Sequence, residues 1–197
     1  MAGASQNATA EDIGLIGSKL SVVQNSDDFF VFFNFAPTGE EKLPDGTQVT
    51  SFKPTGDAFK ALVTLRVTTD DRGVIRKLQL AVARSFIDDP KRCIYAADLV
   101  KSFLVNAGAA SAGDDVGSLA AEINARSIAR STITMLTAQP PPQVSGTPSA
   151  AYQTYAGDPQ PRTLFYKSGR LQVLLKNEAQ SKEPVLDLIV SPVAYKT

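Results

Sequence analysis

Residues 60–108 constrain the fold more than any other stretch, because they contain two strand patterns, a tight turn and a helix pattern in succession. In residues 61–68 apolar side chains alternate with mixed ones, which is typical of a strand with one buried face. Turn-forming residues follow at 70–73, and the alternation then resumes over 74–86. This order predicts an antiparallel hairpin.

A helix is predicted directly after this hairpin. Asp88 and Asp89 supply an acidic cap, and Pro90 stands at the first helical position, where its missing N–H costs nothing. Apolar residues then recur at spacings of three and four, which gives the segment one hydrophobic face. These residues are Cys93, Ala96, Ala97, Val100, Phe103 and Leu104. Gly108 is placed to end the helix in a left-handed conformation, so we expect the helix over 90–107.

An aromatic run over Phe29–Phe35 contains five of the ten phenylalanines of the chain. Aromatic and β-branched side chains favour strands, so we interpret this run as a central strand of the sheet, with a ligand-stacking cluster as the alternative. The segment that follows, 38–56, is rich in Gly, Pro, Glu and Lys. It predicts a long loop, with a short strand around 49–52.

The C-terminal third predicts a three-stranded meander. Its strands are expected over 163–166, 171–176 and 185–190, with polar turns between them. Before the meander, a second amphipathic segment predicts a helix over 115–130. Residues 138–161 hold six of the twelve prolines, which predicts a proline-rich loop. Residues 1–12 are small and polar, and we expect them to form a flexible N-terminal arm.

Together these segments predict a single α+β domain over 13–197. We expect a mostly antiparallel sheet of about five to seven strands with the two helices, 90–107 and 115–130, packed on one face. A chain of 197 residues, of which 43% are hydrophobic, is large enough to bury such a core.

The chain contains no histidine, and this absence narrows its chemistry more than any other feature of composition. It excludes Ser-His-Asp and Cys-His catalysis and zinc sites that use histidine. The single cysteine, Cys93, cannot form an intrachain disulfide, and its place on the hydrophobic helix face predicts a buried, inert thiol. The formal net charge of zero gives no indication of a nucleic-acid partner, and no apolar run is long enough to span a membrane.

Acidic residues occur in adjacent pairs. The pairs are residues 27 and 28, 40 and 41, 70 and 71, 88 and 89, and 114 and 115. Two carboxylates held in a cleft can act as general acid and base or bind a divalent cation. Each pair, however, falls at an expected turn or helix start, where acidic residues are favoured for structural reasons. Because glycine-rich phosphate motifs are also missing, we predict no catalytic residue, no metal site and no cofactor.

Three arginines are the candidate binding residues. Arg76 and Arg84 share the strand register of Leu78 and Leu80, so an ideal strand would point both guanidinium groups at the core. Either they lie at the sheet ends and reach water, which we prefer, or a bulge changes the face, or they line an anion-binding cleft. With Arg66 on the neighbouring strand, the third interpretation predicts a site for a carboxylate or phosphate.

For function, the sequence favours a non-enzymatic binding or protein-interaction module, with a protein or a small anionic ligand as its partner. Two alternatives stay open. One is a histidine-independent enzyme that uses carboxylates and arginines on an anionic substrate, and the other is a structural subunit of a larger assembly. The small, polar start of the chain resembles what remains after a signal peptide is removed, so we expect an exported, periplasmic bacterial protein, with a cytoplasmic protein as the alternative.

Overall fold

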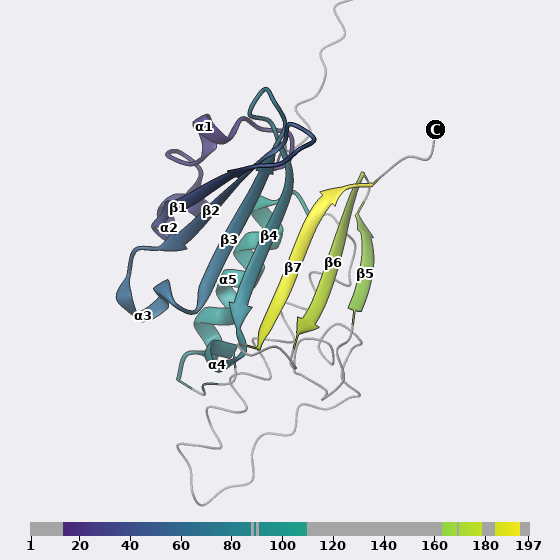
Figure 1. The fold of residues 1–197 in the computed structure, drawn as a ribbon. Coiled ribbons are helices and arrows are strands. Elements are labelled where there is room, and N and C mark those ends of the chain that lie inside the picture. Colours follow the sequence, from purple (N-terminus) through teal and green to yellow (C-terminus); the bar gives the residue numbers. More distant parts are fainter. Residues whose placement is uncertain are drawn as a thin grey trace, which may run out of the picture.

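One antiparallel sheet of seven strands forms the framework in the part of the chain that the computed structural model describes. That part comprises residues 14–87, 89, 91–109, 163–168, 170–178 and 184–193. The strands are β1 (Phe35–Lys42), β2 (Gln48–Pro54), β3 (Val63–Thr69), β4 (Ile75–Ala83), β5 (Thr163–Ser168), β6 (Leu171–Glu178) and β7 (Val185–Pro192). Their order is β1-β2-β3-β4-β7-β6-β5 (Figure 1). The predicted α+β fold with an antiparallel sheet is therefore confirmed.

Five helices accompany the sheet in the described residues, and four of them are short. They are α1 (Leu20–Val23), α2 (Asp28–Phe32), α3 (Asp57–Lys60), α4 (Arg84–Ile87) and α5 (Cys93–Asn106). The long helix α5 lies along one face of the sheet (Figure 1). Its end at Asn106 agrees with the predicted end at 107, but its start does not agree with the prediction. The helix begins at Cys93 with Arg92 as its N-cap and no side-chain cap, so the prediction of an acidic cap followed by a first helical position at 90 is wrong. Within the described ranges, no helix has the length and apolar character needed to cross a membrane.

Several predicted features lie outside the described residues. They are the N-terminal arm over 1–12, the helix over 115–130 and the proline-rich loop over 138–161. The same holds for the side chain of Cys93, although its backbone begins α5. The burial expected for its thiol stays a prediction.

The predicted hairpin consists of β3 and β4. Leu65 lies opposite Leu80 in this pairing, and both side chains are fully buried. The carboxylate of Asp70 closes the turn by accepting hydrogen bonds from the backbone N–H groups of Arg72 and Val74, at 3.0 and 2.9 Å. The hairpin is therefore the result of local turn chemistry and of the alternating pattern of both strands.

The C-terminal meander of β5, β6 and β7 is also present, as predicted, and it completes the sheet by pairing β7 with β4. Apolar residues of the two strands lie opposite one another in this pairing: Leu78 and Val190, Leu80 and Leu188, Val82 and Leu186. None of the six is exposed to solvent. An apolar seam thus joins the two halves of the sheet.

The hydrophobic core lies between one face of the sheet and the helices α2 and α5. Helix α5 contributes the buried side chains of Val100, Phe103 and Leu104. The ring centroid of Phe103 lies 5.9 Å from that of Phe29 in α2, so the two helices meet through their aromatic rings. Burying each of these side chains contributes about 1.5–3 kcal/mol before conformational entropy is subtracted.

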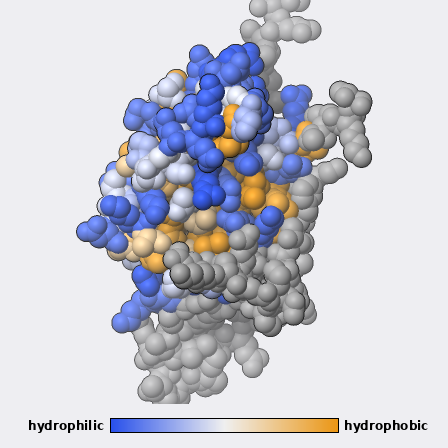
Figure 2. All heavy atoms as spheres, in the orientation of Figure 1, coloured by the Kyte–Doolittle hydropathy of each residue, from blue (hydrophilic) through white to orange (hydrophobic). Residues whose placement is uncertain are grey.

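The opposite face of the sheet, which we call the outer face, has a polar part and an apolar part. Its part on β3 and β4 carries polar residues such as Arg66 and Gln79, which lie opposite one another. Its part on β6 and β7 carries Leu174 and Ile189, which also lie opposite one another and are half-buried. Figure 2 shows the same division, with hydrophilic residues over the N-terminal strands and a hydrophobic patch over β7 and its neighbours.

The prediction of a central strand over Phe29–Phe35 is wrong. The segment belongs mainly to α2 and becomes strand β1 only at its last residue, at the edge of the sheet. Asp27 starts the helix, because its carboxylate accepts a hydrogen bond from the N–H of Phe29 at 2.9 Å. Burial follows the helical turn rather than strand alternation, since Phe29 and Phe30 are adjacent and both buried, whereas Phe32 is 80% exposed.

The long loop predicted over 38–56 is mostly a second hairpin, formed by β1 and β2. Its first strand is an edge of the sheet and carries features that hinder pairing with another strand. Pro37 has no backbone N–H, Thr38 is the additional residue of a bulge, and Glu40 and Glu41 place charges on the edge. These same polar and turn-forming residues made the segment resemble a loop.

The segment before α1 crosses the end of α5 at close range. The N–H of Leu15 donates a hydrogen bond of 2.7 Å to the carbonyl of Asn106. Gly14 lies so close to Gly108 that a Cβ at residue 14 would be 2.4 Å from the Gly108 backbone nitrogen. Gly108 has a φ of +83° and ends the helix in the left-handed conformation, as predicted.

The substitution Gly14→Ala should destabilise the domain, because the new methyl group meets backbone atoms that cannot move aside independently. We expect a loss of about 1–3 kcal/mol in the free energy of unfolding, measured by urea denaturation. The matched control is Gly39→Ala, where a Cβ meets no atom within 4 Å. Equal stability of the two variants would show that the chain does not cross α5 this closely.

Candidate ligand-binding groove

A groove with several aromatic side chains in its walls is formed by residues of α2, α3, α4 and α5 and of the neighbouring ends of β2 and β3. Its volume is about 450 Å³, and small-molecule sites typically span roughly 300–1,000 Å³. Five of the eleven described residues that line it are aromatic: Phe32, Phe33, Phe59, Phe86 and Tyr95. We call this site the aromatic groove.

One wall of the aromatic groove rises from the core to solvent through contacting rings. Phe86 from α4 and Leu99 from α5 are buried at its inner side. The ring of Phe59, from α3, lies 5.4 Å from that of Phe86 and 6.4 Å from that of Tyr95. Tyr95 is 56% exposed, so this wall ends at an aromatic ring that faces water.

The other wall comes from the end of α2. Phe33 is anchored on the core, because its ring centroid lies 5.3 Å from that of Phe29. Phe32 packs edge-to-face against Phe33 at 5.0 Å but is otherwise directed into solvent. Edge-to-face contacts of this kind hold rings in defined orientations. The aromatic groove is therefore preformed on the Phe33 side and open on the Phe32 side.

Two polar residues line the aromatic groove besides the tyrosine. Asn34 adopts a left-handed conformation with a φ of +50°, and its side-chain amide donates a hydrogen bond to the hydroxyl of Thr55. The backbone N–H of Thr55 donates in return to the carbonyl of Asn34, at 3.0 Å. Asp98 differs from Asn34, because it is exposed and its carboxylate forms no hydrogen bond or ion pair with any described residue.

A positive charge lies near the buried end of the aromatic groove and is already neutralised. The guanidinium carbon of Arg92 lies 6.0 Å from the ring centroid of Phe86. Its Nε donates a hydrogen bond of 2.6 Å to the carboxylate of Asp89. The N–H of Lys91, and after it the Arg92 guanidinium, lower the pKa of the Asp89 carboxyl. Arg92 therefore forms a cation–π contact and an ion pair at once.

A second depression, of about 410 Å³, lies on the outer face over β1–β4. Arg66 lies opposite Gln79 and Lys77 lies opposite Thr68, so the two cations are diagonal neighbours across the β3–β4 pair. Neither cation forms a hydrogen bond or ion pair with a described residue. Two glutamates of β1 line the far side of this depression, which we call the outer depression.

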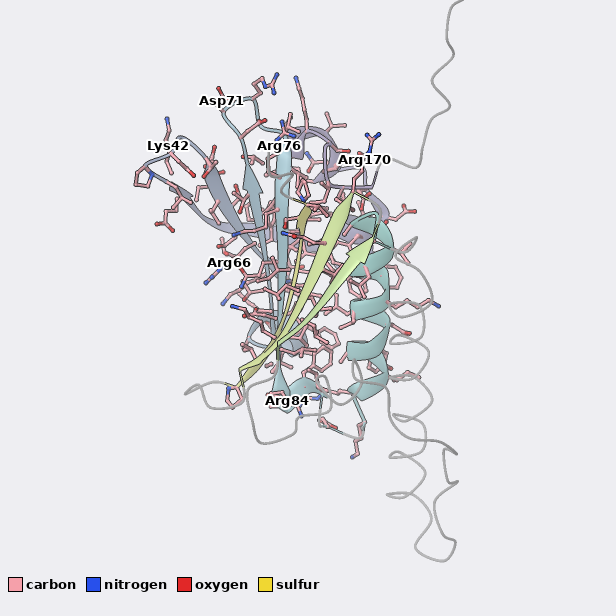
Figure 3. The ribbon with its side chains drawn as sticks, turned by 90° about the vertical axis from the view of Figure 1, so that its right-hand side faces the viewer. Lys42, Arg66, Asp71, Arg76, Arg84 and Arg170 are labelled. Carbon is pink, nitrogen blue, oxygen red and sulfur yellow. The ribbon has the colours of Figure 1, made fainter. Side chains whose placement is uncertain are left out.

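The three candidate arginines lie far apart (Figure 3). Arg76 is near the start of β4, and Arg84 begins α4 beyond the other end of that strand. Arg66 lies in the middle of β3, on the side of the sheet opposite α5. The structure therefore does not bring their guanidinium groups together in one cleft. Arg66 lies in the outer depression, and the second cation there is Lys77.

Arg76 lies at a sheet end and is also the additional residue of a bulge. Thr68 pairs with Lys77 and Thr69 pairs with Ile75, so Arg76 has no partner of its own in β3. Its guanidinium turns back to the hairpin turn, where Nη2 and Nε lie 2.7 and 3.0 Å from the carboxylate of Asp70. Arg76 thus lies both near a sheet end and in a bulge, the two structural positions considered for it.

Asp70 should make the stability of the domain depend on pH. The N–H of Val74, followed by Arg76 and the N–H of Arg72, lowers the pKa of this carboxyl below its ordinary value of 3.8. The stabilisation of the fold by the ionised Asp70 carboxylate is therefore complete at pH values above the ordinary pKa. It is lost as the pH falls through the lowered pKa of the folded protein.

We expect Asp70→Asn to lower the free energy of unfolding at neutral pH. The difference from the unsubstituted protein should shrink as the pH is lowered from about 4 towards 2. Urea denaturation at several pH values measures it. Asp71→Asn is the matched control, because Asp71 lies in the same turn and is exposed. A difference that stays constant down to pH 2 would contradict the assigned role of Asp70.

The structural roles predicted for the acidic pairs are confirmed for three carboxylates. Asp27 caps α2, Asp70 closes the hairpin turn, and Asp89 accepts hydrogen bonds before α5. Glu40 and Glu41 do not fit the prediction, because they lie within the edge strand β1. In the ranges that the structure describes, no cluster of three or more His, Cys, Asp or Glu is arranged to hold a metal ion.

The aromatic groove as a whole was not predicted from the sequence, although the alternative of a ligand-stacking cluster fell on two of its rings, Phe32 and Phe33. Its residues come from four helices and two strands that are distant in the sequence. One local signal was present, however. Tyr95 and Asp98 fall outside the apolar stripe of α5, and Phe32 becomes an exposed aromatic residue once its segment is recognised as a helix.

Comparison with known proteins gives no relative from which to transfer a function: no protein family matches the chain, and no curated protein or solved structure is significantly similar to it.

Proposed function

We propose that the protein is a non-enzymatic binding module whose aromatic groove takes a small apolar ligand. The observation that carries this proposal is the groove itself, a volume of about 450 Å³ walled by five aromatic side chains and open to solvent. Ligand sites commonly combine such apolar walls with a few polar groups. Asn34 and Asp98 are polar groups of this kind.

The exposure of Phe32 supports this proposal. An aromatic ring that is 80% exposed gains little from folding, whereas covering it with a ligand recovers hydrophobic free energy. Tyr95 on the opposite wall is exposed in the same way, so both rims of the groove would gain from a ligand between them. Isolated exposed apolar residues are common on proteins, but two exposed rings that line the same groove support its use as a binding site.

The state of the acidic residues supports a non-enzymatic role. Asp27, Asp70 and Asp89 hold backbone N–H groups, so these carboxylates serve the fold. The expectation of an exported, periplasmic protein fits a ligand-binding module, and we retain it as part of the proposal.

The substitution Phe32→Ser should weaken binding of an apolar aromatic probe such as indole without unfolding the domain, because the side chain is already exposed. We expect about a tenfold increase in the dissociation constant, measured by nuclear magnetic resonance titration of backbone amides. The control is Val22→Ser, which changes another exposed apolar residue, 60% exposed and outside the groove. If indole shifts no resonances of the groove, the proposed function is wrong.

A second candidate function is anion binding in the outer depression, and the unpaired charges of Arg66 and Lys77 favour it. In contrast, Arg72, Arg76 and Arg92 all lie within ion-pair distance of aspartates. A small anion placed between Arg66 and Lys77 would meet two positive groups at once. This is the part of the predicted anion site that the observed geometry still permits.

We expect phosphate to raise the melting temperature of the protein relative to chloride at equal ionic strength, because ligand binding to the folded state stabilises it. The double variant Arg66→Gln, Lys77→Gln should lose most of this increase. The control variant Arg72→Gln removes an exposed arginine that lies outside the outer depression and should retain the increase. An equal phosphate effect in both variants would exclude binding at Arg66.

A further inference from the structure

The aromatic groove carries a negative charge at its rim. Asp98 is the one acidic or basic residue among the described residues that line it. It lies on α5 one turn after Tyr95, so its carboxylate stands at the same rim as that ring. It has no ion-pair partner among the described residues, and even Lys101, one turn further along α5, does not pair with it.

The aromatic walls, like Asp98, favour a positively charged ligand. The face of an aromatic ring is electron-rich and attracts a cation that lies within about 6 Å of its centre. Phe86 already holds the guanidinium of Arg92 at 6.0 Å, which shows that a ring of this groove can take a cation over its face. Since Asp89 neutralises Arg92, that guanidinium does not cancel the negative charge of Asp98.

We propose that the aromatic groove selects a small organic cation, an ammonium group that carries apolar substituents. The ammonium group lies between the Asp98 carboxylate and the ring of Tyr95, and the apolar substituents contact Phe59 and Leu99. A neutral ligand of the same shape would fill the groove equally well but would gain neither the ionic attraction nor the cation–π contact. This inference rests on the proposed function and adds the chemical class of the ligand.

The test uses two probes that have the same shape and differ in charge. Choline carries a quaternary nitrogen where 3,3-dimethylbutan-1-ol carries a quaternary carbon. Their dissociation constants are measured by titration of backbone amide resonances of the groove, at low ionic strength so that the charge is not screened. We expect choline to bind at least about fivefold more tightly than the alcohol.

The substitution Asp98→Asn keeps the size of the side chain and removes its charge. It should reduce the preference for choline at least about threefold and leave the affinity for the alcohol unchanged. Asp71→Asn is the matched control, because Asp71 is exposed in the turn at the far end of β4 and should leave the preference unchanged (Figure 3).

The outcomes separate this inference from the proposed function. If both probes bind the groove with equal affinity, the groove is a binding site without charge selection, and only the inference is overturned. If Asp98→Asn retains the full preference for choline, the role of Asp98 is overturned. If neither probe shifts any groove resonance, the inference falls, and the indole titration then decides the proposed function independently.

Discussion

The pairing of β4 with β7 is the interaction on which the rest of the structure depends. The two strands are more than a hundred residues apart along the chain, as the hydrogen bond between Gln79 and Asp187 illustrates with a separation of 108. Closing so long a loop costs conformational entropy, and the apolar seam between the strands offsets that cost. Because β4 is the middle strand, the seam also supports the surface on which α5 packs and hence the position of Leu99 and Tyr95 at the aromatic groove.

The parts of the fold that local physics decides could be predicted from the sequence. The hairpin of β3 and β4 has alternating strands and a turn closed by Asp70, and the meander has the same kind of signals. The pairing of β7 with β4 could not be predicted, because many apolar strands would suit the same partner.

The run from Phe29 was misassigned for another reason. A continuous apolar run has no period of its own, and the deciding signal was the cap at Asp27.

The candidate site was less predictable than the fold. An arginine pattern in one strand suggested a cleft, but the bulge at Arg76 and the end of β4 before Arg84 separate the guanidinium groups. The aromatic groove depends instead on where four helices end, and no spacing in the sequence encodes that. The sequence does contain the residues that give the groove its chemistry. Phe32, Tyr95 and Asp98 are exposed, so packing of the core does not explain why they are present.

The edge strand β1 has a consequence for how the protein behaves at high concentration. Exposed aromatic residues beside an unprotected sheet edge would provide both adhesion and a template for adding strands from other molecules. The groove residues Phe33 and Asn34 lead directly into β1, where Pro37, the bulge at Thr38 and the charges of Glu40 and Glu41 hinder regular strand addition. The exposed rings of the aromatic groove therefore lie next to a sheet edge that disfavours the addition of strands from other molecules, which lowers the tendency of that side of the sheet to aggregate.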